Sequence, residues 1–260
     1  MSDTDTPGSF VGRVCVLAGG SGGIGAVLAR ELHAAGASLV IGYRANAARA
    51  EELAAALRAE GGPPVELVGG DLARADVRAA LVASASALGN LYGLVVLAGN
   101  PARPADGTAT QDEMAQSLSD NYLGPILLAR SFAEAAGAGG AVVLVSTMQG
   151  VALFEGSLSY AAPKAALVHA ARLLAKEWGG ARDVRVNVVA PGVTAAGMAE
   201  ASIRSGKYDR FIEGGAIRRF GRPEDVTRAI RFFLEPDGYV TGQVVTVDGG
   251  LTLRRDALVR

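Results

Sequence analysis

The feature that most constrains this chain is a glycine-rich stretch between an apolar run and a helical pattern. Residues 13–18 (RVCVLA) predict a buried strand. Glycines recur through 19–25 (GGSGGIG), and an Ala/Leu-rich helical pattern follows to about residue 35. Because glycine lacks Cβ, such a turn lets the backbone approach a phosphate, and the helix N-terminus presents free N–H groups to it. Strand, glycine turn and helix therefore predict a dinucleotide-binding loop.

Strand-like and helix-like segments alternate along the rest of the chain. Further strands are predicted at 38–43, 65–68, 93–99, 141–147, 184–190 and 244–247. Helices are predicted at 46–60, from about 73, at 110–136 with a break at Gly124-Pro125, at 159–178, and from Arg222. This alternation predicts an α/β fold, a single-domain, doubly wound (Rossmann-like) parallel sheet over 1–260 with helices on both faces. A ligand is then expected beyond the carboxyl ends of the strands.

Two segments are expected to stand apart from the packed domain. Residues 1–10 are mostly polar and predict a flexible N-terminus without the apolar core of a signal peptide. Residues 193–215 are small, polar and irregular, which is typical of a substrate lid and also of an ordinary surface excursion.

Composition argues against several classes of function. Half of the residues are apolar and the net charge is −1, so no global field attracts nucleic acid or an anionic membrane. Cys15 is the only cysteine in the sequence, so it cannot form an internal disulfide. The two histidines lie far from it in sequence, so no metal site is predicted. Apolar runs are too short to span a membrane. We expect a soluble, cytoplasmic protein that binds neither nucleic acid nor membrane.

Tyr160 and Lys164 are the strongest candidates for chemistry. They lie four residues apart in a helical pattern, which places them on one face of the helix. A free tyrosine has a pKa of ~10, and a nearby ammonium group favours the phenolate and lowers that pKa. The pair therefore predicts a general acid/base that works near neutral pH. Taken alone, it also fits an ordinary amphipathic helix.

The strand before this helix ends in two hydroxyl residues, Ser146 and Thr147. Side chains alternate along a strand, so Thr147 shares a face with Val145, and Ser146 shares the opposite face with Leu144. Only one of the two hydroxyls can therefore face the tyrosine.

Arg44 decides the expected cofactor. The second strand ends at Tyr43-Arg44, and no acidic residue occurs from 38 to 49. An acid here would accept a hydrogen bond from the ribose 2′-hydroxyl of NAD, whereas arginine suits the 2′-phosphate of NADP. NADP(H) is therefore expected in preference to NAD(H); a solvated arginine at a helix start is the alternative.

Asp71 and Asn121 each have two interpretations. Asp71 follows the third strand, where its carboxylate can accept from an adenine amino group or cap the helix that begins near residue 73. Asn121 lies inside an apolar helix, where its amide needs partners. A structural hydrogen bond is its default interpretation.

Together these segments resemble the short-chain dehydrogenase/reductase family over roughly residues 11–253. The motifs that match in kind, order and spacing are Gly19-x3-Gly23-Ile24-Gly25, Asn121-x2-Gly124, Tyr160-x3-Lys164, Asn187-x3-Pro191-Gly192, and Tyr239-Val-Thr-Gly242 with Val247-Asp-Gly-Gly250. Within the family the chain is most similar to 3-oxoacyl-carrier-protein reductases and related ketoreductases. The resemblance implies hydride transfer between a nicotinamide and a carbonyl or alcohol carbon.

The resemblance also implies roles for the site residues. Tyr160 would protonate the developing alkoxide, and Lys164 would lower its pKa and hold the nicotinamide ribose. Asn121 would hold a water that passes protons onward. The family's serine lies thirteen residues before the tyrosine, which is Thr147 here, with Ser146 as the fallback. The implied cofactor contacts are Gly19, Ser21, Gly23, Ile24, Gly25, Tyr43, Arg44, Asp71, Leu72, Ala98, Gly99, Tyr160, Lys164, Pro191, Gly192 and Val193.

Some residues depart from the family pattern. Ala18 and Ala196 each stand where a threonine is usual, and Val96-Leu97 replace two asparagines. These changes remove polar groups near the cofactor and leave the acid/base residues intact. Pro163 removes one backbone donor from the catalytic helix and is expected to kink it locally.

The expected function is NADPH-dependent reduction of a ketone, and the expected substrate is a 3-oxoacyl thioester or polyketide-type compound. The substrate is free or carried on an acyl carrier protein, although residues 131–163 contain no Lys or Arg to grip such a carrier, which leaves Arg172, Arg182 and Arg185. The alternatives are a dehydrogenase of a free secondary alcohol, such as a polyol or steroid, and a catalytically silent partner subunit. The resemblance implies a homotetramer.

Overall fold

Seven strands form one parallel sheet, and their order reverses in the middle. The computed structural model describes residues 9–101 and 108–254. The strands are β1 (Arg13–Ala18), β2 (Ser38–Tyr43), β3 (Val65–Gly69), β4 (Asn90–Val96), β5 (Gly140–Val145), β6 (Val184–Pro191) and β7 (Val244–Val247), and they lie in the order β3-β2-β1-β4-β5-β6-β7. The chain therefore winds outward in both directions from the β1–β4 pair, which confirms the doubly wound sheet predicted from the sequence.

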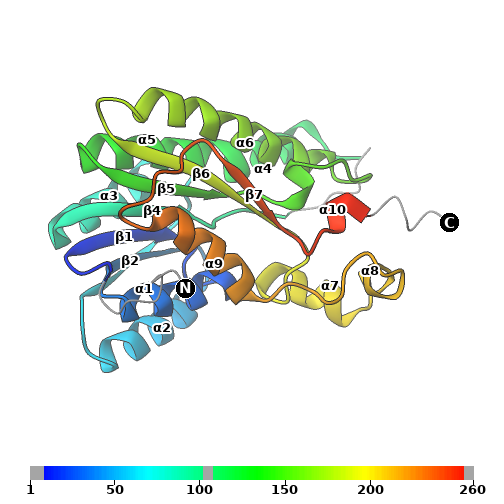
Figure 1. Cartoon of the computed structure of the whole chain (residues 1–260), viewed down its shortest axis with the longest axis horizontal. Helices are drawn as coiled ribbons and strands as arrows, with labels where there is room; N and C mark the ends of the chain where they lie inside the picture. Colours follow the sequence, from blue (N-terminus) through cyan, green and yellow to red (C-terminus); the bar gives the residue numbers. More distant parts are fainter. Residues whose placement is uncertain (1–8, 102–107, 255–260) are drawn as a thin grey trace.

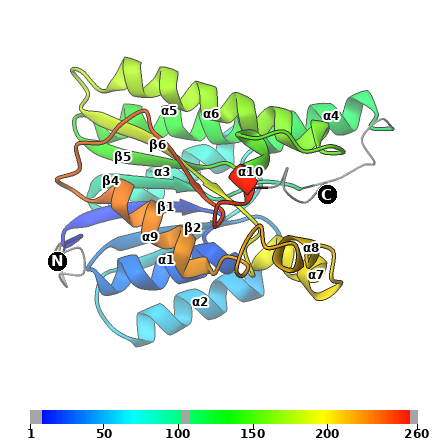
Figure 2. The same ribbon diagram turned by 45° about the vertical axis from the view of Figure 1, so that its right-hand side comes forward.

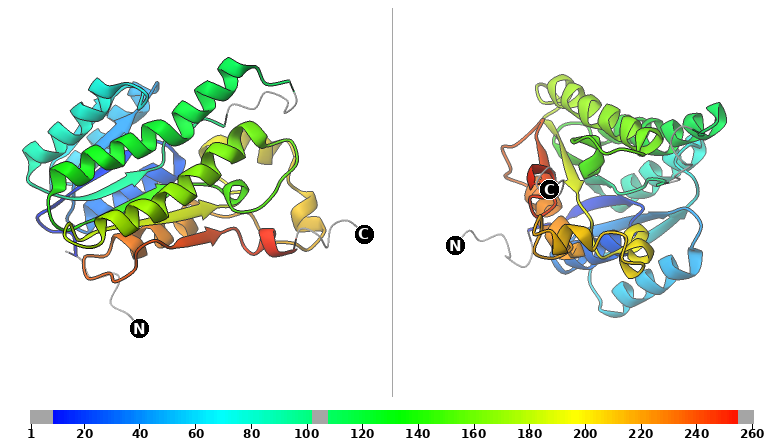
Figure 3. Two further views of the ribbon diagram at one scale, coloured as in Figure 1. Left: turned by 90° about the horizontal axis from the view of Figure 1, so that it is seen from above. Right: turned by 90° about the vertical axis from the view of Figure 1, so that its right-hand side faces the viewer.

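Helices cover both faces of the sheet (Figure 1). One layer contains α1 (Gly23–Ala34), α2 (Ala47–Ala59) and α9 (Pro223–Leu234), and the other contains α3 (Ala75–Leu88), α4 (Gln111–Leu118), α5 (Gly124–Ala136) and α6 (Leu158–Trp178). Figure 3 shows the continuous α4–α5 helix and α6 lying side by side over the sheet. None of these helices is both long and apolar enough to cross a bilayer, within the ranges that the structure describes.

The core lies on both sides of the sheet because its strands are buried on both faces. In β5, Val142 and Leu144 pack with α3, α5 and α6, whereas Val143 and Val145 pack with α1, α2 and α9. This is the alternation expected for a strand. Phe10 is fully buried on the α1 side, and its amide donates to the Ala35 carbonyl oxygen. The predicted flexible N-terminus at 1–10 is therefore wrong for Phe10, and residues 1–8 lie outside the described ranges.

The predicted ends of two strands shift by two or more residues because turns form there. The fourth strand ends at Val96 and not at Gly99, since the Leu97 and Ala98 amides both donate to the Ala18 carbonyl oxygen. The fifth strand ends at Val145 and not at Thr147, because Thr147 caps the short 3₁₀ helix Met148–Gly150.

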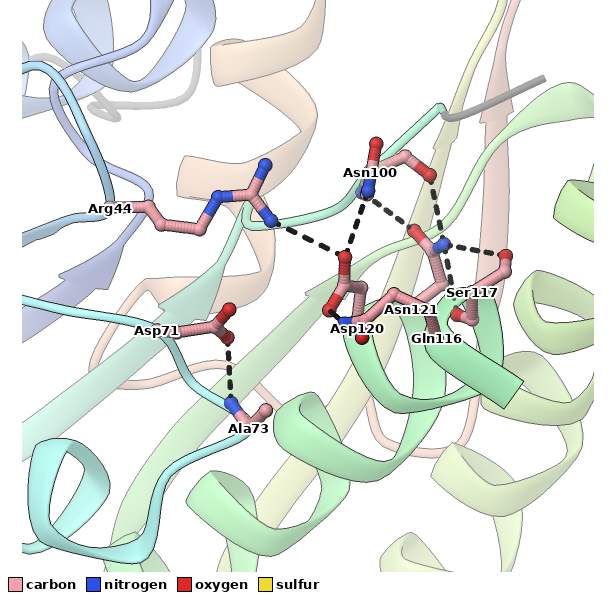
Figure 4. Close-up of polar contacts among 8 residues, drawn as sticks. All are labelled: Arg44, Asp71, Ala73, Asn100, Gln116, Ser117, Asp120 and Asn121. Atoms are coloured by element: carbon pink, nitrogen blue, oxygen red, sulfur yellow. Dashed lines mark hydrogen bonds and ion pairs between the residues drawn. The ribbon is translucent and has the colours of Figure 1, made fainter. Parts of the chain in front are cut away.

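The third helix begins at Ala75 and not near residue 73. The Asp71 carboxylate accepts a hydrogen bond from the Ala73 amide at 2.9 Å, so a turn precedes the helix (Figure 4). Asp71 therefore shapes the turn rather than capping the helix itself.

The predicted break at Gly124-Pro125 is displaced into the preceding residues. Instead of breaking, α4 continues through a π-helical turn at Ser119–Leu123 into α5. Pro125 has no N–H to donate to the Asn121 carbonyl, and its ring would crowd that carbonyl in a regular α-helix. The widened turn accommodates the proline and contains Asn121.

The segment predicted as irregular, 193–215, contains the short helices α7 (Glu200–Arg204) and α8 (Arg210–Glu213). Figure 2 shows α7 and α8 next to each other at the lower right of the view, and Figure 1 shows them at the same end of the molecule as α10 (Leu251–Arg254). Val193 and Phe211 pack with Met148, Ile217 and Leu251 in a third apolar cluster. The segment is thus anchored to the domain by its own apolar residues, and its role as a lid stays a prediction.

Candidate active site

Two adjoining cavities lie at the carboxyl ends of the strands. The larger, about 480 Å³, is lined by residues that follow β1, β2 and β3. The smaller, about 220 Å³, is lined by residues from β5, β6, α6 and the segment 193–199. Gly19, Gly22, Leu97 and Gly99 line both cavities, so one elongated ligand can extend across the point where the strand order reverses.

The structure brings nearly all of the predicted site residues to these cavities. Those at the larger cavity are Gly19, Ser21, Tyr43, Arg44, Asp71, Leu72, Ala98 and Gly99. Those at the smaller are Gly19, Gly23, Ile24, Gly25, Gly99, Thr147, Tyr160, Lys164, Pro191, Gly192 and Val193. Asn121 lines neither cavity and is fully buried behind Gly99.

The glycine loop has the geometry that a phosphate-binding turn requires. Gly19 has a φ of +84°, and a Cβ there would lie 2.8 Å from the Ala98 amide nitrogen. No side chain caps the N-terminus of α1 at Gly22, and its first turn contains no acidic residue. The first N–H groups of this helix therefore remain for an anion, and the two cavities have room on either side for the two halves of a dinucleotide. These residues fit a dinucleotide.

Tyr160 and Lys164 lie one turn apart on α6, and both line the smaller cavity. Lys164 is 3% exposed, and its Nζ donates to the Val145 carbonyl oxygen at 3.0 Å. Burial lowers the pKa of Lys164 to about 8. Tyr160 is 9% exposed. The cavity thus contains a phenol and a buried cation on adjacent turns of one helix.

The two hydroxyl residues after β5 have different surroundings. Ser146 is buried, and its Oγ donates to the Lys164 main-chain carbonyl at 3.0 Å. Thr147 lines the smaller cavity and its Oγ1 accepts from the Gln149 amide at 3.4 Å. That hydroxyl donates to no residue that the structure describes, so its hydrogen can be donated to an acceptor in the cavity. Ser146 therefore anchors the main chain of α6, whereas Thr147 lines the cavity.

The amide of Asn121 holds the main chain of Asn100. Its Nδ2 donates to the Asn100 carbonyl oxygen at 2.9 Å, and its Oδ1 accepts from the Asn100 amide at 3.0 Å (Figure 4). The same Nδ2 lies 3.0 Å from the Ser117 carbonyl oxygen. A Cβ on Gly99 would lie 3.0 Å from Asn121 Oδ1 and 3.1 Å from Lys164 Nζ. Asn121 therefore fixes the loop that separates it from Lys164.

Pro163 does not interrupt α6, which runs continuously from Leu158 to Trp178. In a regular helix, residue 163 would donate to the Ser159 carbonyl, and proline cannot do so. Ser117 Oγ supplies a donor to that carbonyl at 2.6 Å. A side chain of α4 thus takes the place of the missing N–H.

Asp120 is a site residue that the sequence analysis missed. It is buried, it lines the larger cavity, and its Oδ2 lies 3.3 Å from Arg44 Nη1 (Figure 4). Gln116 Nε2 donates to its Oδ1 at 2.7 Å. Gln116 and Asp120 are four residues apart on one helix face, and this spacing could have predicted the hydrogen bond between them. Nothing in the sequence showed that Arg44 lies opposite them.

Gln149 is a second residue that the sequence analysis missed. It lines the smaller cavity and also a neighbouring cavity of about 150 Å³, and Tyr160 lines both. Its buried Oε1 has no hydrogen-bond partner among the described residues. A buried amide oxygen without a donor is unfavourable, so a ligand with a donor group is favoured beside it.

Asn187 and Asp248 belong to two of the matched motifs, but they line neither cavity and instead hold the last strand. Asn187 donates to the Val240 carbonyl oxygen at 2.8 Å and accepts from the Gln243 amide at 3.0 Å. Asp248 accepts from the Gly250 and Thr252 amides, both at 2.8 Å. These contacts fix β7 and the start of α10.

The side chain of Arg185 is held by hydrogen bonds within the domain. Its guanidinium donates to the main-chain carbonyl oxygens of Phe233 and Glu235 at the end of α9. Among the described residues, no group of three or more His, Cys, Asp and Glu side chains is arranged to hold a metal ion.

Comparison with known proteins gives a consistent result. Residues 18–252 match the family model described as enoyl-(acyl carrier protein) reductase. The chain is similar to 3-oxoacyl-[acyl-carrier-protein] reductase of Aggregatibacter actinomycetemcomitans, at 32% identity over 91% of this chain and 98% of that protein. It is also similar to galactitol 2-dehydrogenase (L-tagatose-forming) of Cereibacter sphaeroides, at 33% identity over 93% of this chain and 96% of that protein.

Solved structures give the same picture. A short-chain dehydrogenase from Burkholderia cenocepacia in complex with NADP superposes with a TM-score of 0.86 at 30% identity, covering 94% of this chain and 99% of that one.

Proposed function

The chain belongs to the short-chain dehydrogenase/reductase family, and from this premise we propose that it reduces a ketone to a secondary alcohol with NADPH. Its relatives are oxidoreductases that act on ketones and alcohols. The observation that carries the proposal is the placement of Tyr160 and Lys164 on one helix face, in a cavity that adjoins the glycine loop.

In the proposed reaction Tyr160 is the proton donor. Its phenol protonates the carbonyl oxygen as negative charge develops there, and the Thr147 hydroxyl donates a hydrogen bond to the same oxygen. The Lys164 ammonium stabilises the phenolate that Tyr160 becomes. When bound, the dihydronicotinamide supplies the hydride. Asn121 keeps the loop at Gly99 in place beside the Lys164 ammonium.

NADPH is proposed as the preferred cofactor because Arg44 lines the larger cavity at the end of β2. Its side chain is half exposed, so it can move to meet a 2′-phosphate. The family binds nicotinamide dinucleotides, and the similar Burkholderia protein was solved with NADP.

A 3-oxoacyl thioester or polyketide-type ketone is the proposed substrate. The cavity beyond Tyr160 is lined by Phe154, Tyr208 and Phe211 together with Lys207 and Arg210. Aromatic rings suit an acyl chain, and the two cations suit the phosphate groups of a coenzyme A or carrier-bound thioester.

Oxidation of a free secondary alcohol is the second candidate. The unpartnered Oε1 of Gln149 favours it, because a second hydroxyl of a polyol would donate to that oxygen.

A homo-oligomer, with a tetramer as the expected form, is proposed from the exposed apolar side chains of the long helices. Met114, Leu118, Leu123 and Leu127 on the α4–α5 helix and Leu158 and Leu173 on α6 are all at least 36% exposed. Light scattering during size-exclusion chromatography tests this; a monomer at micromolar concentration would contradict it.

The function is tested by a substrate panel read from the absorbance of the reduced nicotinamide. Acetoacetyl-coenzyme A and a reactive diketone are reduced with NADPH or NADH, and polyols are oxidised with NADP⁺ or NAD⁺. Tyr160→Phe is expected to lower kcat/KM by about 10²–10⁴-fold while NADPH still binds. Tyr239→Phe, a change on a fully exposed ring, is the matched control.

The outcomes separate the candidates. Equal rates for wild type and Tyr160→Phe would show that the acid role is wrong. Faster polyol oxidation than ketone reduction favours the second candidate. Binding of NADPH without turnover of any compound would instead favour a catalytically silent subunit.

A further inference from the structure

The carboxylate of Asp120 is buried and shared among three donors. Its Oδ2 accepts from Asn100 Nδ2 at 2.9 Å and from Arg44 Nη1 at 3.3 Å, and its Oδ1 accepts from Gln116 Nε2 at 2.7 Å. The Asp120 side chain is 3% exposed, whereas that of Arg44 is 53% exposed. Figure 4 shows the Arg44 side chain extending from the end of β2 toward the start of the π-helical turn.

The contact between Arg44 and Asp120 can open at low cost to the carboxylate. If Arg44 turns away, Asp120 keeps the shorter hydrogen bonds from the side chains of Asn100 and Gln116. An ion pair with one partner half exposed contributes little stability. Arg44 makes no other hydrogen bond or ion pair to a residue that the structure describes, so most of its N–H groups are available to a ligand.

Arg44 and Asp120 bring opposite charges to one point of the larger cavity. Arg44 attracts a 2′-phosphate, but Asp120 competes for the guanidinium and repels the phosphate dianion. A ribose 2′-hydroxyl carries no charge and is not repelled. The carboxylate therefore reduces the advantage that Arg44 gives to a phosphorylated ribose over an unphosphorylated one.

We propose that Asp120 is a specificity-determining residue that acts through Arg44, limiting the preference for NADP(H) so that NAD(H) is also accepted. The proposal deepens the proposed function and rests on it, since Arg44 must contact the 2′-phosphate. It predicts a modest rather than an absolute preference in the wild-type protein.

The test measures binding without catalysis, by isothermal titration calorimetry of the full-length protein. The probes are 2′,5′-ADP and 5′-ADP, which differ by the 2′-phosphate alone. Asp120→Asn is expected to tighten binding of 2′,5′-ADP about tenfold and to change binding of 5′-ADP by less than about twofold. Asp112→Asn, the same substitution at an exposed position of the same helix, is the matched control and leaves the ratio of the two affinities unchanged.

Arg44→Gln completes a double-mutant cycle. In the Arg44→Gln background, Asp120→Asn is expected to change the affinity ratio less, because it then removes only the direct repulsion between the carboxylate and the phosphate, and no longer the competition for the guanidinium. Asp120→Ser is measured in parallel and gives the same direction, which keeps the test valid if Asp120→Asn does not fold.

Two failures are distinguishable. If Arg44→Gln leaves the affinity ratio unchanged, Arg44 does not read the 2′-phosphate, and the proposed cofactor is wrong. If Arg44→Gln lowers the ratio but neither Asp120 variant raises it, NADPH use stands and the role of Asp120 is overturned.

Discussion

The ammonium group of Lys164 donates to the carbonyl oxygen of Val145 at 3.0 Å, which ties α6 to the carboxyl end of β5. The contact holds a cation inside a cavity lined largely by glycine and apolar residues. One neutral carbonyl offsets only part of the cost of removing an ammonium from water, and burial accordingly lowers the pKa of Lys164 to about 8.

Lys164→Met is expected to alter how stability depends on pH. At pH 7 the wild-type lysine is charged in both the folded and unfolded states, so the folded state bears the full cost of the buried charge. Between pH 8 and 10.5 the folded protein releases its proton first, and the unfolded state then binds more protons. Stability therefore rises with pH in this window by up to a few kcal/mol.

Urea denaturation of wild type and Lys164→Met between pH 7 and 10.5 measures this difference. The variant should lack the rise, so its free energy of unfolding gains most relative to wild type at pH 7 and least at pH 10.5. Parallel curves for the two proteins would show that Lys164 does not titrate in this range.

Gly99→Ala should impair the site without unfolding the protein. The new Cβ would lie 3.0 Å from Asn121 Oδ1 and 3.1 Å from Lys164 Nζ, so at least one of these side chains must shift. We expect kcat/KM to fall at least about tenfold, because small displacements of reacting groups are costly. Gly180→Ala is the control, since a Cβ there has no neighbour within 4 Å. Normal activity of Gly99→Ala would contradict this prediction and would mean that the loop can move aside without displacing Asn121 or Lys164.

Thr147 and Ser146 should respond differently to removal of their hydroxyl groups. Thr147→Val is expected to lower kcat/KM by about 10²-fold or more, as loss of a donor to a developing oxyanion does, and Thr147→Ser should restore most of it. Ser146→Ala should instead cost about 1 kcal/mol of stability, because its Oγ bonds the main chain of Lys164. Steady-state kinetics and urea denaturation measure the two effects; a larger kinetic loss in Ser146→Ala would reverse the assignment.

Much of the fold could be predicted from the sequence because parallel strands are buried on both faces and appear as continuous apolar runs. The strands at 13–18, 38–43 and 244–247 have the predicted bounds. The cavity residues could be placed for a related reason: the carboxyl ends of parallel strands meet at one edge, so residues that follow different strands become neighbours.

The remaining features depend on contacts between distant segments. Arg44 and Asp120 lie 76 residues apart in sequence, and no local pattern joins them. The π-helical turn lies directly before Gly124-Pro125, and from the sequence this pair indicated only that the helix is disturbed nearby. The sequence identified Asn121 as an amide in need of partners but could not identify Asn100 as the partner.

Ser117 should matter more to stability than an ordinary helix serine, because its hydroxyl replaces a backbone donor that Pro163 lacks. Its Oγ donates to the Ser159 carbonyl oxygen at 2.6 Å, and Asn121 Nδ2 lies 3.1 Å from the same Oγ. Ser117→Ala is therefore expected to lower the free energy of unfolding by about 1–3 kcal/mol.

In a Pro163→Ala background the restored main-chain N–H can donate to the Ser159 carbonyl, so the loss caused by Ser117→Ala should shrink. Urea denaturation of the two single variants and the double variant gives the coupling. Additive losses would mean that the serine and the proline act independently, and that the hydroxyl serves Asn121 alone.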